Sequence, residues 1–274
     1  MSSDKKLSPP VVLTIAGSDS SAGAGIQADL KAIHANGGYA LTVVTGVVAE
    51  SPHEVVDWQA MPQELIMDQV RSVCEAYPVA AVKIGLLFDV ELVEILASFL
   101  QGLNVPIVID PVGTASAGGG FGGAQVREAI AKHLFPIATV VTPNLLEAQG
   151  LTLTPEIQQT QVQLACNLRE QFETAILVKG GHSADEKSAI DVLVLNNGEI
   201  HYFSDRRIQG VDYHGTGCSL SSAIATHLAL GESLKRSTEI AKSYLHKAML
   251  EGLVWVSPAR SRKTSALNLF LRNS

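Results

Sequence analysis

Residues 11–29 read VVLTIAGSDSSAGAGIQAD, and this stretch decides the fold. Its beginning, Val11–Ala16, is apolar and rich in β-branched side chains, which is typical of a buried strand. A turn rich in glycine and serine follows, and after it Ile26, Leu30 and Ile33 recur at the spacing of one helix face. The stretch therefore predicts a strand, a glycine-rich turn and a helix in succession.

The same alternation continues along the chain. The pattern predicts further strands over residues 40–49, 80–84, 105–109, 139–141 and 175–178, and helices over residues 62–77, 90–100, 126–134 and 161–172. Because strands that alternate with helices form β-α-β units, we expect an α/β fold whose central, mostly parallel sheet is covered by helices on both faces. Residues 190–195 and 199–203 flank Asn196-Asn197-Gly198, which predicts a late antiparallel hairpin. Two helices are predicted after it, over residues 218–230 and 234–252.

No linker and no fixed-period repeat divides the chain. We predict one domain over residues 11–252, a polar lead over residues 1–10 and a tail of unassigned role over residues 253–274. Residues 115–123 read ASAGGGFGG, and this glycine-rich stretch is interpreted as a mobile flap, because long flexible loops often carry function.

Composition excludes several classes of protein. With 46% hydrophobic and 17% charged residues the chain is not disordered, and its net charge of −7 argues against a nucleic-acid partner. The first apolar run is too short for a signal segment or a membrane span. The three cysteines, Cys74, Cys166 and Cys218, form no C-x-x-C pair, which argues against a disulfide framework and a zinc site. A reducing, cytoplasmic location is therefore expected.

The first glycine-rich turn also matches a dinucleotide-binding fingerprint. Gly23-x-Gly25-x-x-Ala28 opens the helix, and Glu50 ends the second strand near the ribose-binding position of that motif. This match would indicate an NAD-dependent oxidoreductase. The loop is longer than the tight turn of the fingerprint, and Asp19 and Asp29 would place negative charge near a pyrophosphate. We therefore keep the oxidoreductase only as an alternative.

A second glycine motif opens the helix after the hairpin, where residues 213–220 read YHGTGCSL. Gly215 and Gly217 allow backbone amides to turn toward one point, and the start of the helix adds the positive end of its dipole. These features predict an oxyanion or phosphate site. Cys218 lies in the first turn, where the pKa of a thiol is lowered, so it is a candidate base or nucleophile. A thiol that only packs the helix start is the alternative.

Two histidines lie beside glycine motifs. We interpret His214 as a cap or core residue and His182 as a hydrogen-bonding loop residue, and neither as a proton carrier. The sequence contains no G-x-x-x-x-G-K-[ST], H-E-x-x-H or G-x-S-x-G motif, which argues against a P-loop NTPase, a tight zinc site and an α/β-hydrolase.

Six motifs occur in one order along the chain: IAGSDSSAGAGIQAD (15–29), VKIGLL (82–87), DPV (110–112), TPNLLEA (142–148), KGGH (179–182) and HGTGCSLS (214–221). Together they resemble the hydroxymethylpyrimidine/phosphomethylpyrimidine kinases, which are ribokinase-fold enzymes of thiamine biosynthesis. The resemblance covers roughly residues 11–250, and the tail beyond Gly252 differs from the usual ending of the family. It implies a ribokinase-like three-layer sandwich and a homodimer. It also implies two successive phosphoryl transfers from ATP with Mg²⁺, the first to the hydroxymethyl group of 4-amino-5-hydroxymethyl-2-methylpyrimidine and the second to the resulting phosphate.

The resemblance also implies a role for each matching residue. The anion hole for the moving phosphoryl group would consist of Gly215, Thr216, Gly217 and Cys218, with Cys218 as the base for the alcohol. The nucleotide phosphates would meet Lys179, with Asp110 and Asn144 nearby, and Mg²⁺ would be oriented through water by Asn144, Glu147 and Asp110. The pyrimidine pocket would consist of Gly17, Asp29, Glu50, Leu86 and Val112.

Three departures from the family pattern concern the substrate. Glu50 replaces the usual glutamine; glutamine offers a donor and an acceptor to an aminopyrimidine edge, whereas an ionised glutamate only accepts. Gly113 replaces a usual methionine, and residues 114–118 lack a lysine that would help to hold the substrate phosphate.

Two further alternatives stay open. One is a pyridoxal or pyridoxine kinase of the same fold. The other is a non-catalytic sensor of a small molecule, against which the intact 215–218 and Asn144/Glu147 elements argue.

Overall fold

The structure, a computed structural model, describes residues 8–112, 123–152, 159–181, 187–208, 213–256 and 263–270. The strands of the main sheet are β1 (Val11–Asp19), β2 (Tyr39–Ser51), β3 (Glu54–Ala60), β4 (Val79–Ile84), β5 (Ile107–Ile109), β6 (Val140–Val141), β7 (Ala175–Val178), β8 (Ser188–Val194) and β9 (Ile200–Arg206). The helices are α1 (Gly25–Ala35), α2 (Gln63–Ala76), α3 (Val90–Gln101), α4 (Gly123–Ala129), α5 (Leu145–Leu151), α6 (Gln161–Phe172), α7 (Thr216–Ala229) and α8 (Leu234–Leu250). A second, two-stranded sheet consists of β10 (Leu253–Val256) and β11 (Lys263–Ala266).

The main sheet confirms the predicted α/β class. Its strand order is β3-β2-β1-β4-β5-β6-β7-β8-β9. The six strands from β2 to β7 in this order run parallel, β3 is antiparallel to β2, and β8 and β9 form the predicted antiparallel hairpin beside β7. All parallel strands therefore end at one edge of the sheet, which is where open α/β sheets bind ligands.

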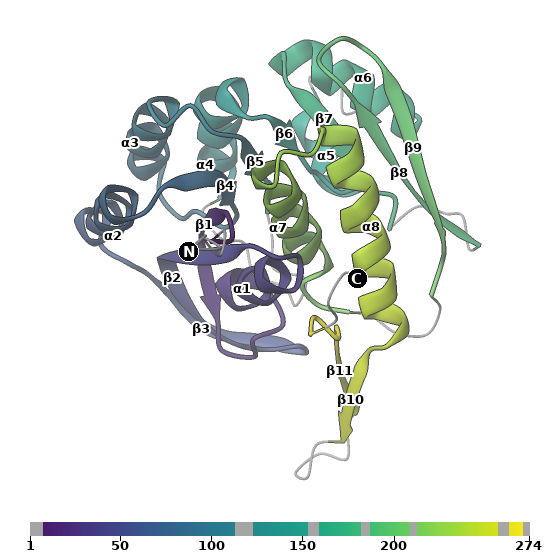
Figure 1. Cartoon of the computed structure of the whole chain (residues 1–274), viewed down its shortest axis with the longest axis horizontal. Helices are drawn as coiled ribbons and strands as arrows, with labels where there is room; N and C mark the ends of the chain where they lie inside the picture. Colours follow the sequence, from purple (N-terminus) through teal and green to yellow (C-terminus); the bar gives the residue numbers. More distant parts are fainter. Residues whose placement is uncertain are drawn as a thin grey trace, which may run out of the picture.

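Helices cover both faces of the sheet. On β1, Leu13 and Ile15 pack into one core with residues of α2, α3 and α6, whereas Val12 packs into the other core with residues of α1, α7 and α8. This alternation follows from the two-residue period of a strand. Figure 1 shows α1, α7 and α8 side by side on one face, with α7 between the other two. The start of α7 is thereby held beside the ends of the central strands.

Several elements differ from the prediction. The sequence pattern did not predict β3, an edge strand whose side chains are all exposed or half-buried and which therefore lacks an apolar pattern. It also missed the short helix α5 and the β10–β11 hairpin, and α7 begins at Thr216 rather than at residue 218. The proposed flap, apart from Gly123, and residues 113–118 with their departures from the family lie outside the described residues, as do His182 and residues 1–7.

Part of the predicted tail packs onto the domain. The β10–β11 hairpin extends beyond the end of α8 (Figure 1), and Thr264 on β11 lies 3.4 Å from the His53 ring in the β2–β3 turn. After β11, Leu267 and Leu269 are buried in the core beside α8, where the Tyr244 hydroxyl donates a hydrogen bond to the Leu269 carbonyl at 3.2 Å. The chain after Gly252 thus contributes to the hydrophobic core.

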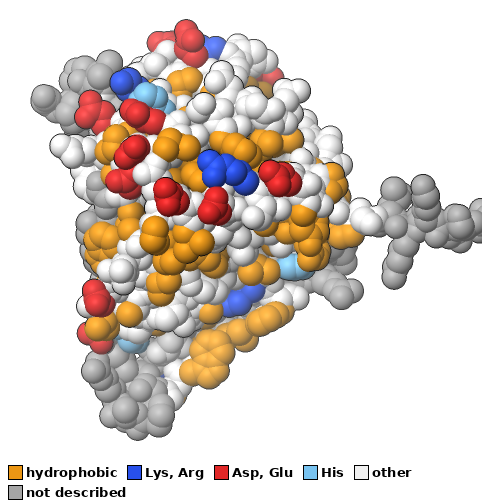
Figure 2. Space-filling model, turned by 90° about the vertical axis from the view of Figure 1, so that its left-hand side faces the viewer, with side chains coloured by type: hydrophobic (Ala, Val, Ile, Leu, Met, Phe, Trp, Pro, Cys, Tyr) orange, Lys and Arg blue, Asp and Glu red, His pale blue; other side chains and the backbone are white. Residues whose placement is uncertain are grey.

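The outer surface of α2 and α3 is acidic. Figure 2 shows acidic side chains scattered over the side of the molecule that carries these helices. Arg71 is the one basic residue of the two helices, which expose Glu64, Asp68, Glu75, Glu91 and Glu94. Such a surface repels nucleic-acid phosphates. Within the described ranges, no helix has the length and apolarity that a membrane crossing requires.

Candidate active site

A cleft of about 340 Å³ opens at the carboxyl ends of the parallel strands. It lies between the turn after β1, the end of β2, the loop after β5 and the start of α7. All the predicted site residues except Asp29 line this cleft: Gly17, Glu50, Leu86, Val112, Asp110, Asn144, Glu147, Lys179, Gly215, Thr216, Gly217 and Cys218. Motifs separated by up to 200 residues of sequence therefore meet in one place.

The start of α7 has the geometry predicted for an anion hole. Its N-cap, Gly215, has a left-handed backbone (φ 81°), and a Cβ there would lie 1.8 Å from the Gly23 carbonyl oxygen, so that only glycine fits. Among the described residues no side chain caps this helix, and the amides of Thr216, Gly217 and Cys218 come before the first intrahelical bond, which Ser219 donates to Gly215. Three amides and the helix dipole thus point toward the cleft.

Lys179 brings positive charge to this anion hole. Its ammonium donates to the Asp110 carboxylate at 2.7 Å, and a Cβ on Gly217 would lie 3.0 Å from both the Lys179 Nζ and the Asp110 Oδ2. Burial alone would lower the pKa of Lys179, but the Asp110 and Glu147 carboxylates together outweigh burial and raise that pKa. Lys179 therefore stays charged beside the helix start.

The N-x-x-E element is a capping box. The Asn144 side chain accepts from the Glu147 amide at 2.9 Å, and the Glu147 carboxylate accepts from the Asn144 amide at 2.7 Å. These bonds fix both side chains at the start of α5, on the cleft wall next to Lys179. Carboxylate and amide oxygens suit Mg²⁺, and because each side chain already has a backbone partner, the donor set fits an ion held through water molecules and nucleotide phosphates.

Asp29 is placed differently from the expectation. It is fully buried behind the cleft wall, where its carboxylate accepts from Lys83 at 2.8 and 2.9 Å, from Thr14 at 2.6 Å and from Ser222 at 2.8 Å. It does not line the cleft, because α1 directs it into the core rather than toward the strand ends. Asp29 thus holds Lys83, whose side chain reaches the cleft wall.

The expectation of a lowered pKa for Cys218 is wrong. Burial raises the pKa of its thiol to about 12, with the Asp29 and Asp110 carboxylates acting in the same direction, against Lys83 and the Gly25 amide. The helix start does not compensate for the lost hydration. Cys218 is therefore a neutral thiol on the cleft wall at physiological pH, and a protonated thiol is not a resting general base.

Alkylation measures this protonation state. Because only about one in 10⁴ of the Cys218 side chains is ionised near pH 8, we expect iodoacetamide to modify it roughly a thousandfold more slowly than an unperturbed thiol. The rate should rise about tenfold per pH unit up to roughly pH 10, which separates ionisation from restricted access. Mass spectrometry of the peptide containing Cys218 gives the rate, and Cys218→Ser identifies the signal. A rate equal to that of a free thiol would contradict the raised pKa.

The backbone amides of the glycine-rich turn after β1 are hydrogen-bonded to the Asp19 side chain. The Asp19 carboxylate accepts from the amides of Ser21 (2.6 Å), Gly23 (3.0 Å) and Ala24 (2.7 Å). The amides that a pyrophosphate would need are thus already bonded to a carboxylate, and this geometry argues against the dinucleotide alternative.

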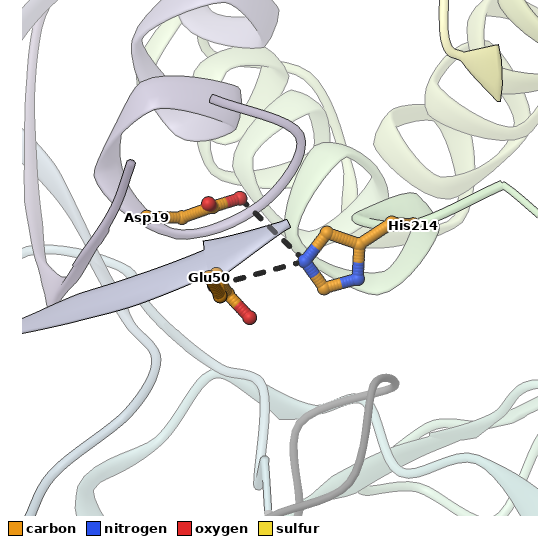
Figure 3. Close-up of side chains that lie close together, drawn as sticks. All are labelled: Asp19, Glu50 and His214. Atoms are coloured by element: carbon orange, nitrogen blue, oxygen red, sulfur yellow. Dashed lines mark ion pairs between the residues drawn. The ribbon is translucent and has the colours of Figure 1, made fainter. Parts of the chain in front are cut away.

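His214 lies between two carboxylates rather than capping a helix. Its Nε2 is 3.5 Å from Asp19 Oδ2 and 3.8 Å from Glu50 Oε1, and Figure 3 shows the ring pointing toward both. Burial alone would lower the pKa of His214, but Asp19 and Glu50 raise it to about 9. In return, His214 and the turn amides hold the pKa of Asp19 far below its usual range, although burial alone would raise it. An imidazolium therefore balances one of the two acidic charges.

This imidazolium makes stability depend on pH. A pKa of about 9 in the folded chain against 6.5 for free histidine means that the stabilisation is complete below about pH 6.5 and is lost as pH rises through 9. We expect the unfolding free energy to fall by on the order of 3 kcal/mol over that range. In His214→Gln the unfolding free energy should depend much less on pH over the same range. Urea denaturation at several pH values measures it, with His133→Gln as the control, because the half-buried His133 pairs with the exposed Glu94. An equal slope in His214→Gln would contradict the assignment.

The far end of the cleft contains residues that were not predicted from the sequence. Lys242 on α8 donates to Asp191 on β8 at 2.7 Å and to the Ala189 carbonyl at 2.9 Å, and Asp191 also accepts from the Gly180 amide. All of these except Gly180 line the cleft. No local motif marks Lys242 or Asp191, because their proximity depends on how α8 crosses the hairpin.

The fold and the anion hole together define a phosphotransferase that acts on a small molecule. A family model described as phosphomethylpyrimidine kinase matches residues 19–257, and the chain belongs to this family. The hydroxymethylpyrimidine/phosphomethylpyrimidine kinase of Streptomyces coelicolor is 40% identical over 247 residues, which cover 90% of this chain and 91% of that protein. The family predicted from the six motifs is thereby confirmed.

Solved structures agree with the fold. The pyridoxal kinase of Staphylococcus aureus in complex with AMP-PCP and pyridoxal has a TM-score of 0.84 at 27% identity and covers 97% of this chain and 95% of its own. The phosphomethylpyrimidine kinase of Clostridium difficile has a TM-score of 0.73 at 34% identity and covers 88% of this chain and 99% of its own. The ribokinase-like sandwich expected from the sequence is confirmed.

Proposed function

We propose that this protein transfers a phosphoryl group from ATP to the hydroxymethyl group of 4-amino-5-hydroxymethyl-2-methylpyrimidine, and a second one to the resulting monophosphate, in thiamine biosynthesis. The observation that carries the proposal is the start of α7, which lies beside Lys179 in the middle of the cleft and has no side-chain cap among the described residues. On one side of it is the polar far end of the cleft, and on the other is the cluster of Asp19, Glu50 and His214. One end of the cleft suits phosphates and the other suits a ring with hydrogen-bond donors. Family membership supports this substrate.

Different residues of the cleft bind the phosphoryl group and the pyrimidine ring. Lys179 and the amides of residues 216–218 hold the transferred phosphoryl group and the charge that develops on it. The pyrimidine ring lies near Gly17, Leu86, Val112 and Glu50, which directs its hydroxymethyl group toward the helix start. Positioning of this kind supplies most of the catalysis in phosphoryl transfer, because the transition state is loose and little covalent chemistry falls to the protein.

Cys218 positions the acceptor hydroxyl in this proposal. Its neutral thiol lines the cleft between the helix start and Lys83, so it contacts the hydroxyl without taking its proton in the resting state. In a loose transition state the proton of the alcohol leaves late, so a strong base is not required. Cys218→Ala should therefore lower kcat at every pH, and the shape of the plot of kcat against pH should stay that of the wild type.

ATP and Mg²⁺ complete the proposed site. We place the nucleotide phosphates between the anion hole and the Lys242–Asp191 pair, and the similarity to a kinase in complex with AMP-PCP supports ATP as the phosphoryl donor. Asn144, Glu147 and Asp110 would hold Mg²⁺ through water, and the bound ion would withdraw charge from the phosphate oxygens. We also propose, from family resemblance, a cytoplasmic homodimer.

A pyridoxal kinase is the second candidate, favoured by the TM-score of 0.84. Steady-state kinetics with ATP and each of the hydroxymethylpyrimidine, its monophosphate and pyridoxal separates the two. We expect kcat/KM to be highest for the hydroxymethylpyrimidine and the monophosphate to be converted as well. A higher value for pyridoxal would overturn the proposed substrate, and unreactive monophosphate would restrict the enzyme to the first transfer.

A further inference from the structure

Glu50 has a buried oxygen without a partner. Its side chain is 6% exposed, and within the described part of the chain its Oε2 makes no hydrogen bond. Leaving such a carboxylate oxygen unsatisfied costs free energy, so the position calls for a donor from elsewhere. Glu50 lines the cleft at the end expected to hold the ring, and a ligand can supply that donor.

The charged groups around Glu50 do not sum to zero. From β1 comes Asp19, whose carboxylate already accepts from three amides, and from the segment before α7 comes His214. From β3 and its turn come only His53, Glu54 and Asp57, all exposed. Two carboxylates and one imidazolium leave this cluster with one net negative charge. A ligand that brings one positive charge balances it.

We propose that Glu50 selects the pyrimidine in its ring-protonated form: the carboxylate accepts one hydrogen bond from the exocyclic amine and one from the protonated ring nitrogen beside it. This inference rests on the proposed function. The proton is taken up from solvent onto the lone pair of the ring nitrogen when the ligand binds, no other bond forms or breaks, and the proton returns to solvent when the product leaves.

Geometry favours the proton on the ring. A neutral aminopyrimidine would direct the lone pair of its ring nitrogen at a carboxylate oxygen, which is repulsive, whereas its protonated form offers two parallel donors in a charge-assisted pair. A proton on Glu50 would serve the same hydrogen bonds. The ultraviolet spectrum of the bound ring distinguishes these two placements of the proton.

Calorimetry tests the proposal without turnover. The hydroxymethylpyrimidine is titrated into the full-length protein without ATP near pH 7, in two buffers with different ionisation enthalpies. We expect uptake of about one proton per bound ligand and an ultraviolet difference spectrum that matches the protonated ring. Glu50→Gln, whose amide offers a donor to the unprotonated nitrogen, should bind with little uptake and with the spectrum of the neutral ring. Glu75→Gln, an exposed change of the same charge on α2, should behave as the wild type.

The outcomes separate this inference from the proposed function. If the wild type binds the pyrimidine without taking up a proton, the inference is overturned, and this result does not require that Glu50→Gln folds. If Glu50→Gln folds and takes up as many protons as the wild type, the inference is overturned as well. Tight binding of Zn²⁺ alone, lost in His214→Gln and competitive with the pyrimidine, would make the cluster a metal site and would also overturn it. If the protein neither binds nor phosphorylates the hydroxymethylpyrimidine, the proposed function fails; phosphorylation without proton uptake refutes the inference alone.

Discussion

Lys179→Met is expected to lower kcat with the hydroxymethylpyrimidine by about 10² to 10³-fold, because it removes a preorganised charge from the site where phosphoryl charge develops. The Lys179 ammonium lies beside the uncapped start of α7, within 3.0 Å of the position that a Gly217 side chain would occupy. No other described cation lies this close to Gly217. The effect should therefore appear in kcat more than in the KM for the pyrimidine, which binds at the other end.

The same substitution leaves Asp110 without its ion-pair partner. Asp110 is 2% exposed and keeps only a 3.3 Å hydrogen bond from Thr142 among the described side chains. Lys179→Met/Asp110→Asn removes the uncompensated charge, so it should recover stability but not the rate. Lys235→Met, an exposed substitution on α8, controls for the loss of a lysine. Steady-state kinetics and urea denaturation measure the two effects, and a kcat within threefold of wild type in Lys179→Met would refute the role of Lys179.

The sequence predicted the fold well where one physical signal was sufficient. Buried parallel strands such as β1 and β7 are continuous apolar runs, and β7 was predicted with its observed bounds. The edge strand β3 was missed because Glu54–Ala60 faces solvent and carries polar residues. Its pairing with β2 depends on the neighbouring strand rather than on its own pattern.

The site was predictable where function depends on the backbone. Gly215 and Gly217 are needed for close approach, and such a requirement is visible in a sequence as glycine at fixed spacing. Charge states were not predictable in the same way. The first turn of a helix suggested an ionised Cys218, but its pKa depends on burial and on Asp29, which is 189 residues away in the sequence. His214 was interpreted as a cap or core residue because nothing local shows that Asp19 and Glu50 flank it.

Lys83→Met is expected to have the largest effect on stability, a loss of about 3–5 kcal/mol of unfolding free energy. Lys83 and Asp29 are both fully buried, and their ion pair connects β4 to α1 beneath the anion hole. Burial alone would lower the pKa of Lys83, but Asp29 raises it, so the lysine is charged in the core. Without the lysine, the Asp29 carboxylate would be a buried charge whose remaining partners among the described side chains are the hydroxyls of Thr14 and Ser222.

The double variant Lys83→Met/Asp29→Asn separates a lost charge pair from lost packing. Asparagine can still accept from Thr14 and Ser222, so the pair of substitutions should cost clearly less than Lys83→Met alone. Chemical denaturation of the four proteins in this cycle gives the coupling energy, with Lys235→Met as the surface control. A Lys83→Met variant within about 1 kcal/mol of wild type, or a double variant that is simply additive, would contradict a buried ion pair. Because Lys83 lowers the pKa of Cys218 and Asp29 raises it, alkylation of Cys218 should be slower still in Lys83→Met and should recover in the double variant, which connects the core pair to the chemistry of the cleft wall.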